Sequence, residues 1–251
     1  MNQTAHLFAS IAAGRDLPAE VARQFDDIGF AIVPGPIPST KLPALQAAYD
    51  RAVASADPAD VGSGRTTTRV WDFVIRGSEF DDLYIHPPVL EACCHVLGAP
   101  FHLSTMHARA LNPGGKAQDL HADYRRTKDV WPMLGFIYMV DDFRVDNGAT
   151  RFVPGSHHWS HAPGDVMTDA SADYEGQVSA CGPAGSVVIY NGSVWHGHGT
   201  NSTTTPRRSI QGAYIRRDDK QAFDHGARMR PETLARIGPL ARYVLNLDAA
   251  T

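Results

Sequence analysis

From residue 101 onward the chain contains a series of short apolar runs, each bounded by glycine, proline or acidic residues. The runs lie at residues 101–111, 133–140, 149–153, 186–190 and 209–215. Apolar runs of this length, separated by turn residues, are typical of strands rather than helices. Many strands at this density favour a sandwich or a barrel. We therefore expect a mainly β fold with flanking helices.

Helical patterns lie on either side of these runs. Apolar residues recur at helical spacing over residues 18–28, about 39–55, 87–97 and 231–247. Gly29 and Gly98 follow two of these segments, where glycine commonly ends a helix. Residues 30–33 predict a short strand, and residues 57–68, rich in Gly, Ser, Thr, Asp and Pro, predict a flexible loop.

The length and composition suit one domain over residues 1–251. A chain of 251 residues with 43% hydrophobic content can bury one full core. We expect a helical support over about 1–100, a sheet core over about 101–216 and a helical tail over about 217–251.

The charge and the cysteines limit the partners and the compartment. A net charge of -4 with both signs interspersed gives no footprint for nucleic acid or an anionic membrane, so small molecules are the expected partners and a homo-oligomer stays open. No window approaches a membrane span and no signal-like start is present, which predicts a cytoplasmic protein. Cys93, Cys94 and Cys181 make an odd count, which favours reduced, buried thiols.

A metal site is predicted by His121 and Asp123, which alternate with Ala122. Alternate side chains of an extended segment point the same way, so these two ligands would be aimed at one point. His196, arriving from a separate strand, would complete two imidazoles and one carboxylate. Such a set, with open positions on the other face of the metal, is typical of non-haem Fe(II) oxygenases.

Three blocks of sequence carry a more specific resemblance. They run from Leu111 to Asp123, from Asn147 to His157 and from His196 to Arg208, and the resemblance they carry extends over roughly residues 70–216. In order and spacing the chain resembles the phytanoyl-CoA dioxygenase-like group of Fe(II)/2-oxoglutarate oxygenases. The resemblance implies a double-stranded β-helix, or jelly roll, as the core.

The resemblance also implies Fe(II), 2-oxoglutarate and O2 as cofactor and co-substrates. Its spacing picks Arg207 for the far carboxylate of 2-oxoglutarate, a group that guanidinium matches in geometry. Arg208 is the alternative, but only one of two adjacent strand residues can face the interior. Gln118 and Thr150 are implied as further contacts to 2-oxoglutarate; turn formation and strand propensity are their alternative explanations.

Other histidines offer two alternatives to this metal site. His198 lies on the same face of an extended segment as His196 and is the alternative ligand, but the His-Gly-x-Gly-x-Asn pattern that begins at His196 favours His196. A second metal site is the alternative reading of the histidines that follow Pro154-Gly-Ser. We expect those histidines at the surface or the cavity mouth: His157, His158 and His161.

The implied reaction oxidises a C–H bond of a small molecule or natural product, with hydroxylation as the expected outcome and succinate and CO2 as co-products. Desaturation, epoxidation and ring formation start from the same chemistry and stay open. Asp123 argues against halogenation, because halogenating relatives replace the carboxylate by a small residue. The alternative from another class is a catalytically silent jelly roll that keeps its metal for structure.

Substrate contacts are predicted from aromatic and polar residues near the motifs. The candidates are Trp71, Phe73, His107, Arg109, Tyr124 and Trp195. For Trp71 and Phe73, burial in the core is the alternative. An anionic substrate would suit several arginines, namely Arg69, Arg76, Arg109, Arg125 and Arg126. An apolar scaffold would equally suit Trp71, Phe73 and Trp131.

Overall fold

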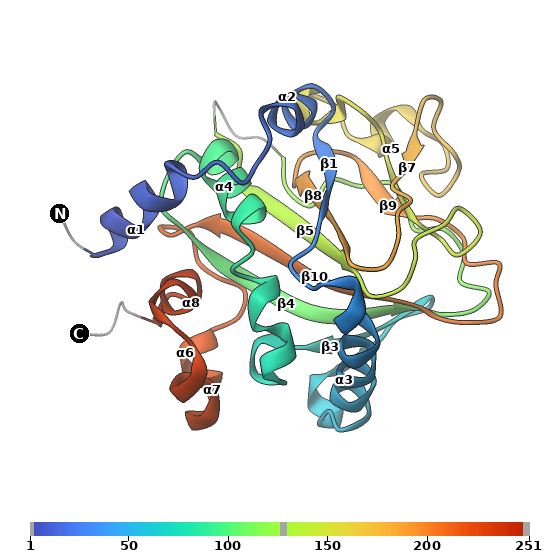
Figure 1. The fold of residues 1–251 in the computed structure, drawn as a ribbon. Coiled ribbons are helices and arrows are strands. Elements are labelled where there is room, and N and C mark those ends of the chain that lie inside the picture. The colour runs from blue at the N-terminus through green and yellow to red at the C-terminus, as the bar shows by residue number, and fades with distance from the viewer. Residues whose placement is uncertain (1–2, 126–129, 248–251) are drawn as a thin grey trace.

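The largest element of the fold is a sheet of seven antiparallel strands in the order β1-β8-β5-β10-β4-β3-β2 (Figure 1). The computed structural model describes residues 3–125 and 130–247. In chain order the strands of this sheet are β1 (Phe30–Pro34), β2 (Val61–Ser63), β3 (Thr67–Trp71), β4 (Phe101–Leu111), β5 (Met133–Met139), β8 (Ser186–Asn191) and β10 (Arg207–Arg216).

A second, smaller sheet lies at the upper right of Figure 1, in the order β7-β6-β9. Its strands are β6 (Thr150–Phe152), β7 (Val178–Ser179) and β9 (His196–His198). His121 forms an isolated antiparallel bridge with His196 of β9. The mainly antiparallel β architecture with flanking helices agrees with the expectation from the sequence.

Helices flank the main sheet. They are α1 (Gln3–Ala12), α2 (Ala19–Ile28), α3 (Leu42–Ala54), α4 (Pro87–Leu97), α5 (Pro163–Val166), α6 (His225–Arg228), α7 (Pro231–Arg236) and α8 (Pro239–Val244). Helix α4 packs against β4, β5, β8 and β10, near the middle of the sheet. It begins with two prolines and ends at Gly98, whose φ of 60° lies in the left-handed region that suits glycine.

The first hundred residues supply more than helical support. β1, β2 and β3 all belong to the main sheet, so no boundary at residue 101 divides that sheet. The segment expected as a loop over 57–68 contains a short 3-10 turn (Pro58–Asp60), β2 and the start of β3. Two threonines begin β3, and β-branched residues pack well on a pleated surface, which overrides the turn-like composition.

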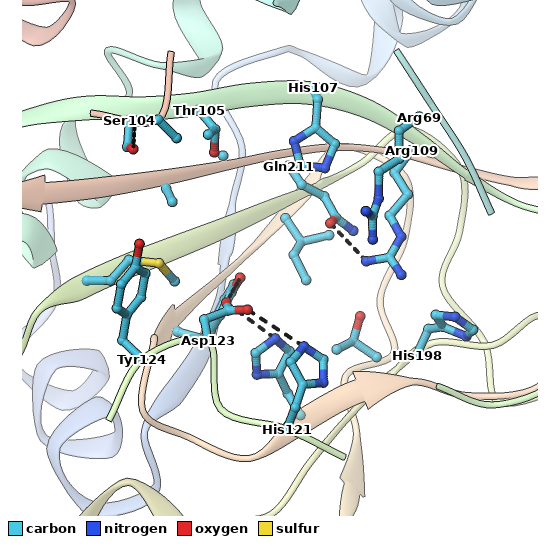
Figure 2. A pocket seen from close by; sticks show the side chains of 18 of the residues that line it. Arg69, Ser104, Thr105, His107, Arg109, His121, Asp123, Tyr124, His198 and Gln211 are labelled. Atoms are coloured by element: carbon cyan, nitrogen blue, oxygen red, sulfur yellow. Dashed lines mark hydrogen bonds and ion pairs between the residues drawn. The ribbon is translucent and has the colours of Figure 1, made fainter. Parts of the chain in front are cut away.

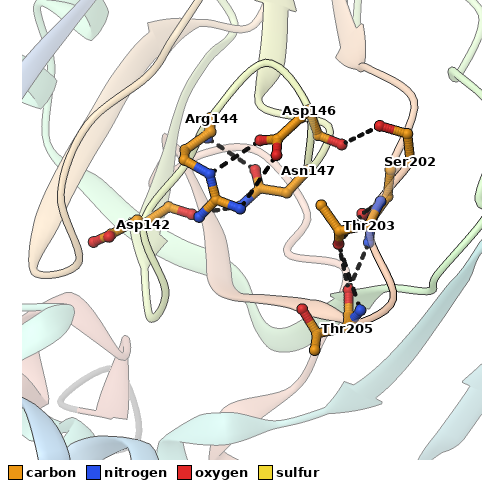
Figure 3. Close-up of polar contacts among 8 residues, drawn as sticks. Asp142, Arg144, Asp146, Asn147, Ser202, Thr203 and Thr205 are labelled. Atoms are coloured by element: carbon orange, nitrogen blue, oxygen red, sulfur yellow. Dashed lines mark hydrogen bonds and ion pairs between the residues drawn. The ribbon is translucent and has the colours of Figure 1, made fainter.

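The loops before β10 are fixed by their own polar contacts (Figure 3). The Asn147 side-chain amide donates to the carbonyl of Asp142 over 2.8 Å, and the Ser202 hydroxyl donates to the carbonyl of Asp146 over 2.9 Å. Thr203 donates its hydroxyl to the carbonyl of Thr205 over 3.1 Å. These bonds hold together the loop after β5 and the loop that enters β10, so the starting register of β10 is defined locally.

Phe73 lies in the core and not at a substrate site. Its side chain is fully buried, with ring centroids 5.6 Å from Tyr49 and 4.7 Å from Phe80. The chain enters a 3-10 turn directly after β3, which directs Phe73 beneath the helices. The prediction of a substrate contact at Phe73 is therefore wrong, and its alternative, a core position, is correct.

The cysteines and the lengths of the helices bear on two further expectations from the sequence. Cys93, Cys94 and Cys181 are all free thiols; Cys93 is buried as expected, whereas Cys94 is half-buried and Cys181 is exposed. Among residues 3–125 and 130–247, no helix combines the length and the apolar character needed to cross a bilayer.

The position of Phe73 predicts a loss of stability on truncation. Phe73→Ala leaves a cavity next to Tyr49 and Phe80, so we expect the free energy of unfolding to fall by about 3–5 kcal/mol. Val145→Ala, at a side chain that is 71% exposed, is the control and should change it by less than about 0.5 kcal/mol. Urea unfolding followed by circular dichroism measures both. Equal stabilities for the two variants would contradict the core position.

Candidate functional site

The candidate site is built on a backbone pair between His121 and His196. The His121 N–H donates to the His196 carbonyl over 3.0 Å, and the His196 N–H donates to the His121 carbonyl over 2.9 Å. Residues that exchange both bonds stand directly opposite each other in an antiparallel pair. Their imidazole rings consequently lie side by side, with centroids 4.5 Å apart.

Asp123 joins the two imidazoles to complete a potential metal site (Figure 2). Its two carboxylate oxygens lie 3.6 Å from His121 Nε2 and 3.6 Å from His196 Nε2, respectively. All three ligand atoms lie within 4.8 Å of one another, a separation that one ion can bridge. The structure thus brings together the three residues that the sequence predicts as ligands.

The orientation of both imidazoles suits metal binding. The other ring nitrogen of each histidine faces a carbonyl: His121 Nδ1 lies 2.9 Å from the Asp119 oxygen and His196 Nδ1 lies 3.0 Å from the Val194 oxygen. A carbonyl only accepts, so Nδ1 carries the hydrogen and Nε2 keeps its lone pair. This is the usual outer support of metal-ligating histidines. Two neutral nitrogens and one carboxylate fit a divalent transition metal with open positions.

Tyr190 is a functional residue that the sequence analysis did not identify. Its hydroxyl donates to Asp123 Oδ2 over 3.0 Å and so orients the carboxylate. Gly135 on the neighbouring strand makes room for the ring, since a Cβ there would lie 2.2 Å from it. In the sequence, Tyr190 is distinguished only by its polar hydroxyl at the end of the apolar run 186–190. Strand propensity explains a tyrosine at that position equally well.

The charge states of the site follow from burial and proximity. Burial alone would raise the pKa of Asp123, but the nearby imidazoles of His196 and His121 and the hydrogen bond from Tyr190 prevail and bring it to about 2. Burial lowers the pKa of His196 to about 4. At neutral pH the site therefore presents an ionised carboxylate and, at His196, an unprotonated imidazole.

Residues 25–209 match the family described as phytanoyl-CoA dioxygenase (PhyH). The chain belongs to this family. Among curated proteins, dioxygenase cdmD of Talaromyces verruculosus is 31% identical over 164 residues, which cover 59% of this chain and 52% of that protein. The chain thus spans about half the length of this relative.

Solved structures with similar folds confirm the jelly roll. The epimerase SnoN, in complex with Fe3+, alpha ketoglutarate and nogalamycin RO, matches with a TM-score of 0.64 and 22% identity, covering 78% of this chain and 82% of SnoN. HygX from Streptomyces hygroscopicus, with nickel and 2-oxoglutarate bound, matches with a TM-score of 0.68 and 18% identity, covering 82% of this chain and 89% of HygX.

A cavity of about 310 Å³ opens beside the three ligands. Of the predicted site residues, several line it: Gln118, Thr150, His107, Arg109 and Tyr124, besides the ligands themselves. Arg109 and His107 point into it from β4, as the alternation along that strand predicts (Figure 2). Arg69 of β3 stands directly opposite Arg109 in the sheet register and also lines the cavity.

Arg109 is embedded among amides. Its guanidinium donates to Gln118 Oε1 over 3.0 Å and to Gln211 Oε1 over 3.3 Å. Burial and the neighbouring Arg69 lower its pKa to about 10. Neither Arg69 nor Arg109 forms an ion pair with a carboxylate in the described part of the chain. The sequence analysis did not identify Gln211, which lies on the same strand face as Arg207.

Arg207 faces inward and Arg208 outward: alternation predicts opposite faces, and the family resemblance chose Arg207 as the inward residue. Arg207 is 2% exposed, whereas Arg208 pairs with Asp141 and Asp50. The Arg207 guanidinium carbon lies 3.9 Å from the centroid of the Phe143 ring, and its Nε and NH1 have no hydrogen-bond partner in the described structure. Burial lowers the pKa of Arg207 to about 9. Its side chain is not among those that line the cavity.

Trp195 and Trp71 do not line the cavity. Trp195 is buried and packs its ring against Trp159, His161 and Tyr174, because neighbouring strand residues point to opposite faces and His196 takes the cavity side. The prediction of a substrate contact at Trp195 is wrong. Trp71 packs at a tilt against the His107 ring, with centroids 4.9 Å apart.

The described positions of the remaining candidates lie outside the metal group. His198 lines the cavity but does not join the metal group, which favours His196 as predicted. His157 and His158 both place Nε2 near the Asp26 carbonyl, and no second metal group occurs among residues 3–125 and 130–247. Other sequence candidates have separate contacts: Trp131 packs on His157 and His158, Arg76 pairs with Asp60, and Arg125 with Asp165. Arg126 lies outside the described residues.

The Tyr190 contact predicts a change in metal affinity. Tyr190→Phe removes the only hydroxyl donor to Asp123 in the described structure, so we expect Fe(II) affinity to fall by roughly 10- to 100-fold. Tyr138→Phe is the matched control, because the buried Tyr138 hydroxyl has no described partner. Anaerobic calorimetric titration with Fe(II) measures both. Unchanged affinity in Tyr190→Phe would show that Asp123 is oriented without it.

Proposed function

We propose that this chain is a non-haem Fe(II)- and 2-oxoglutarate-dependent dioxygenase that hydroxylates a C–H bond of a small molecule. The observation that carries the proposal is the group formed by His121, Asp123 and His196, with both Nδ1 atoms tied to carbonyls and a cavity alongside. Membership of the dioxygenase family supports it. In this proposal residues 1–251 act as one dioxygenase domain.

The three ligands would hold Fe(II). When bound there, the iron supplies the oxidising chemistry in which 2-oxoglutarate and O2 are consumed and succinate and CO2 are released. Asp123 stays ionised across the neutral range and so offsets one charge of the metal. Tyr190 keeps the carboxylate turned toward both imidazoles, which limits the ways in which the ligands can rearrange.

Gln118, Thr150 and Arg207 are proposed to hold 2-oxoglutarate. Arg109 donates to Gln118 Oε1, so the amide nitrogen of Gln118 is left to donate to another acceptor. Arg207 is a buried guanidinium with two unpartnered nitrogens, and buried charges of this kind call for an anionic partner. Because Arg109 lines the cavity and donates to Gln118 Oε1, we add it to this set as a positioning residue for Gln118.

The substrate is proposed to be a small natural-product scaffold. SnoN was solved with nogalamycin RO, and HygX with hygromycin B, so related folds bind such molecules. Because SnoN is an epimerase, the fold also serves outcomes other than hydroxylation. His107, Arg109 and Tyr124 are the predicted contacts that line the cavity and are retained as substrate-contact candidates.

An anaerobic titration tests the cofactor assignment. With Fe(II) and 2-oxoglutarate, the wild type is expected to show the visible charge-transfer band of the chelated keto acid. Asp123→Ala should lose the band, and Arg207→Ala should need roughly 10- to 100-fold more 2-oxoglutarate, because a charge-assisted hydrogen bond is lost. Arg208→Ala, whose side chain points outward, is the matched control and should behave as wild type.

Folded wild type that binds metal without the band would overturn the dioxygenase proposal in favour of a silent jelly roll. Where the band forms, a substrate screen by succinate release follows. The product of a substrate found in this way is expected to gain one oxygen atom by mass spectrometry. A product without added oxygen would replace hydroxylation by desaturation or ring formation.

A further inference from the structure

The cavity has a charged end and an uncharged end (Figure 2). The charged end carries Arg69, Arg109, Gln118, His198 and Gln211. The uncharged end carries Ser104, Thr105, Met133, Ala213, Ile215 and Ala222. The strand register explains the division: Ala213 stands opposite Thr105 and Ile215 opposite Met133, whereas Gln211 stands opposite His107. Among the described residues, no side chain with a formal charge lines the uncharged end.

The uncharged end is completed by a segment that follows β10. We call residues 221–228 the C-terminal wall. The Ala222 N–H donates to Ser104 Oγ over 3.0 Å, and the Phe223 N–H donates to the Ser104 carbonyl over 3.2 Å. The Phe223 ring stacks on Trp71 with centroids 5.7 Å apart. The wall lies outside the residues 25–209 that match the family, so family membership predicts nothing about it.

Arg228 anchors the C-terminal wall to the body of the protein. Its Nε donates to Asp72 Oδ2 over 2.7 Å, and its NH2 donates to Asp60 Oδ1 over 2.6 Å. Asp72 is a buried carboxylate in the left-handed region, with φ of 58°, a conformation that asparagine and aspartate tolerate best among residues other than glycine. Burial would raise the pKa of Asp72, but hydrogen bonds from His225 and Arg228 prevail and lower it.

We propose that the C-terminal wall determines substrate specificity: the uncharged end accepts a neutral, largely apolar group, and the small side chain of Ala222 sets the size of that group. An ionic group placed there would lose its hydration without gaining a partner. An apolar group would bury its surface against Met133 and Ile215. The inference rests on the proposed function, because it assigns the charged end to 2-oxoglutarate.

The test uses N-phenyl-1-naphthylamine, a neutral apolar fluorophore, with anaerobic protein loaded with Fe(II) and 2-oxoglutarate. We expect saturable fluorescence enhancement with the wild type. Ala222→Trp fills the uncharged end and should weaken binding of the fluorophore at least tenfold. Lys220→Trp is the matched control, because Lys220 is exposed and does not line the cavity, and it should bind as wild type.

A second variant tests the anchor. Arg228→Met removes both hydrogen bonds to Asp72 and Asp60, so we expect faster hydrogen–deuterium exchange at the Ala222 and Phe223 amides and weaker fluorophore binding. Arg230→Met, at an exposed arginine of the following turn, is the control. The charge-transfer band should persist in every variant, since all of these changes spare the charged end.

These outcomes separate the two proposals. Loss of the band in the wild type would overturn the proposed function. A retained band with no saturable fluorophore binding, or with equal binding in wild type and Ala222→Trp, would overturn the assignment of specificity to the C-terminal wall. Unchanged amide exchange in Arg228→Met would overturn the anchoring role.

Discussion

The two backbone hydrogen bonds between His121 and His196 are the interaction on which the site depends. They join the segment after β4 to β9, which are far apart in sequence, and they set two imidazoles side by side. A second brace lies close by, where Arg151 of β6 donates to the Gln118 carbonyl over 2.7 Å and to the Ala172 carbonyl over 3.1 Å. Main-chain pairing with the small sheet therefore positions the site, and this pairing fixes the orientation of the ligand side chains.

Negative and positive side chains occupy separate parts of the interior. Asp123 is the one formal negative charge among the described residues that line the cavity, and it faces the histidines. The guanidinium groups of Arg69 and Arg109 lie at one end, and Arg207 is buried against Phe143. Arg69 and Arg109 stand opposite each other in the sheet, and like charges in that position repel and so destabilise the pairing. An anion bound between them would offset that repulsion, which is consistent with the proposal of a dicarboxylate co-substrate in this cavity.

Sequence reasoning succeeded where local periodicity decides the outcome. The strand over 101–111 and the helix over 87–97 follow from spacing alone, and the structure places both as predicted. The choice of Arg207 over Arg208 as the inward residue came from the family resemblance, and Arg207 is the more buried of the two. It failed where a tertiary neighbour decides. Phe73 carries no local sign of the face it takes, and the role of Tyr190 depends on Gly135 of a different strand leaving space. Trp195, by contrast, could have been excluded by alternation alone, because its neighbour His196 takes the cavity side. The strands β2 and β3 were not predicted because strand pairing, of β2 with β3 and of β3 with β4, overrides a composition rich in turn residues.

The strand order of the main sheet has a consequence for the way the chain reaches its native state. β1 pairs with β8, so that Phe30 stands opposite Tyr190, and β10 lies between β5 and β4. During synthesis the first strand leaves the ribosome long before its partner, and the central strand arrives almost last. Contacts between such distant parts of the sequence make loop closure costly and folding slow. Until β10 inserts, β4 and β5 each have an unpaired edge. The nascent chain therefore exposes strand edges to which chaperones can bind.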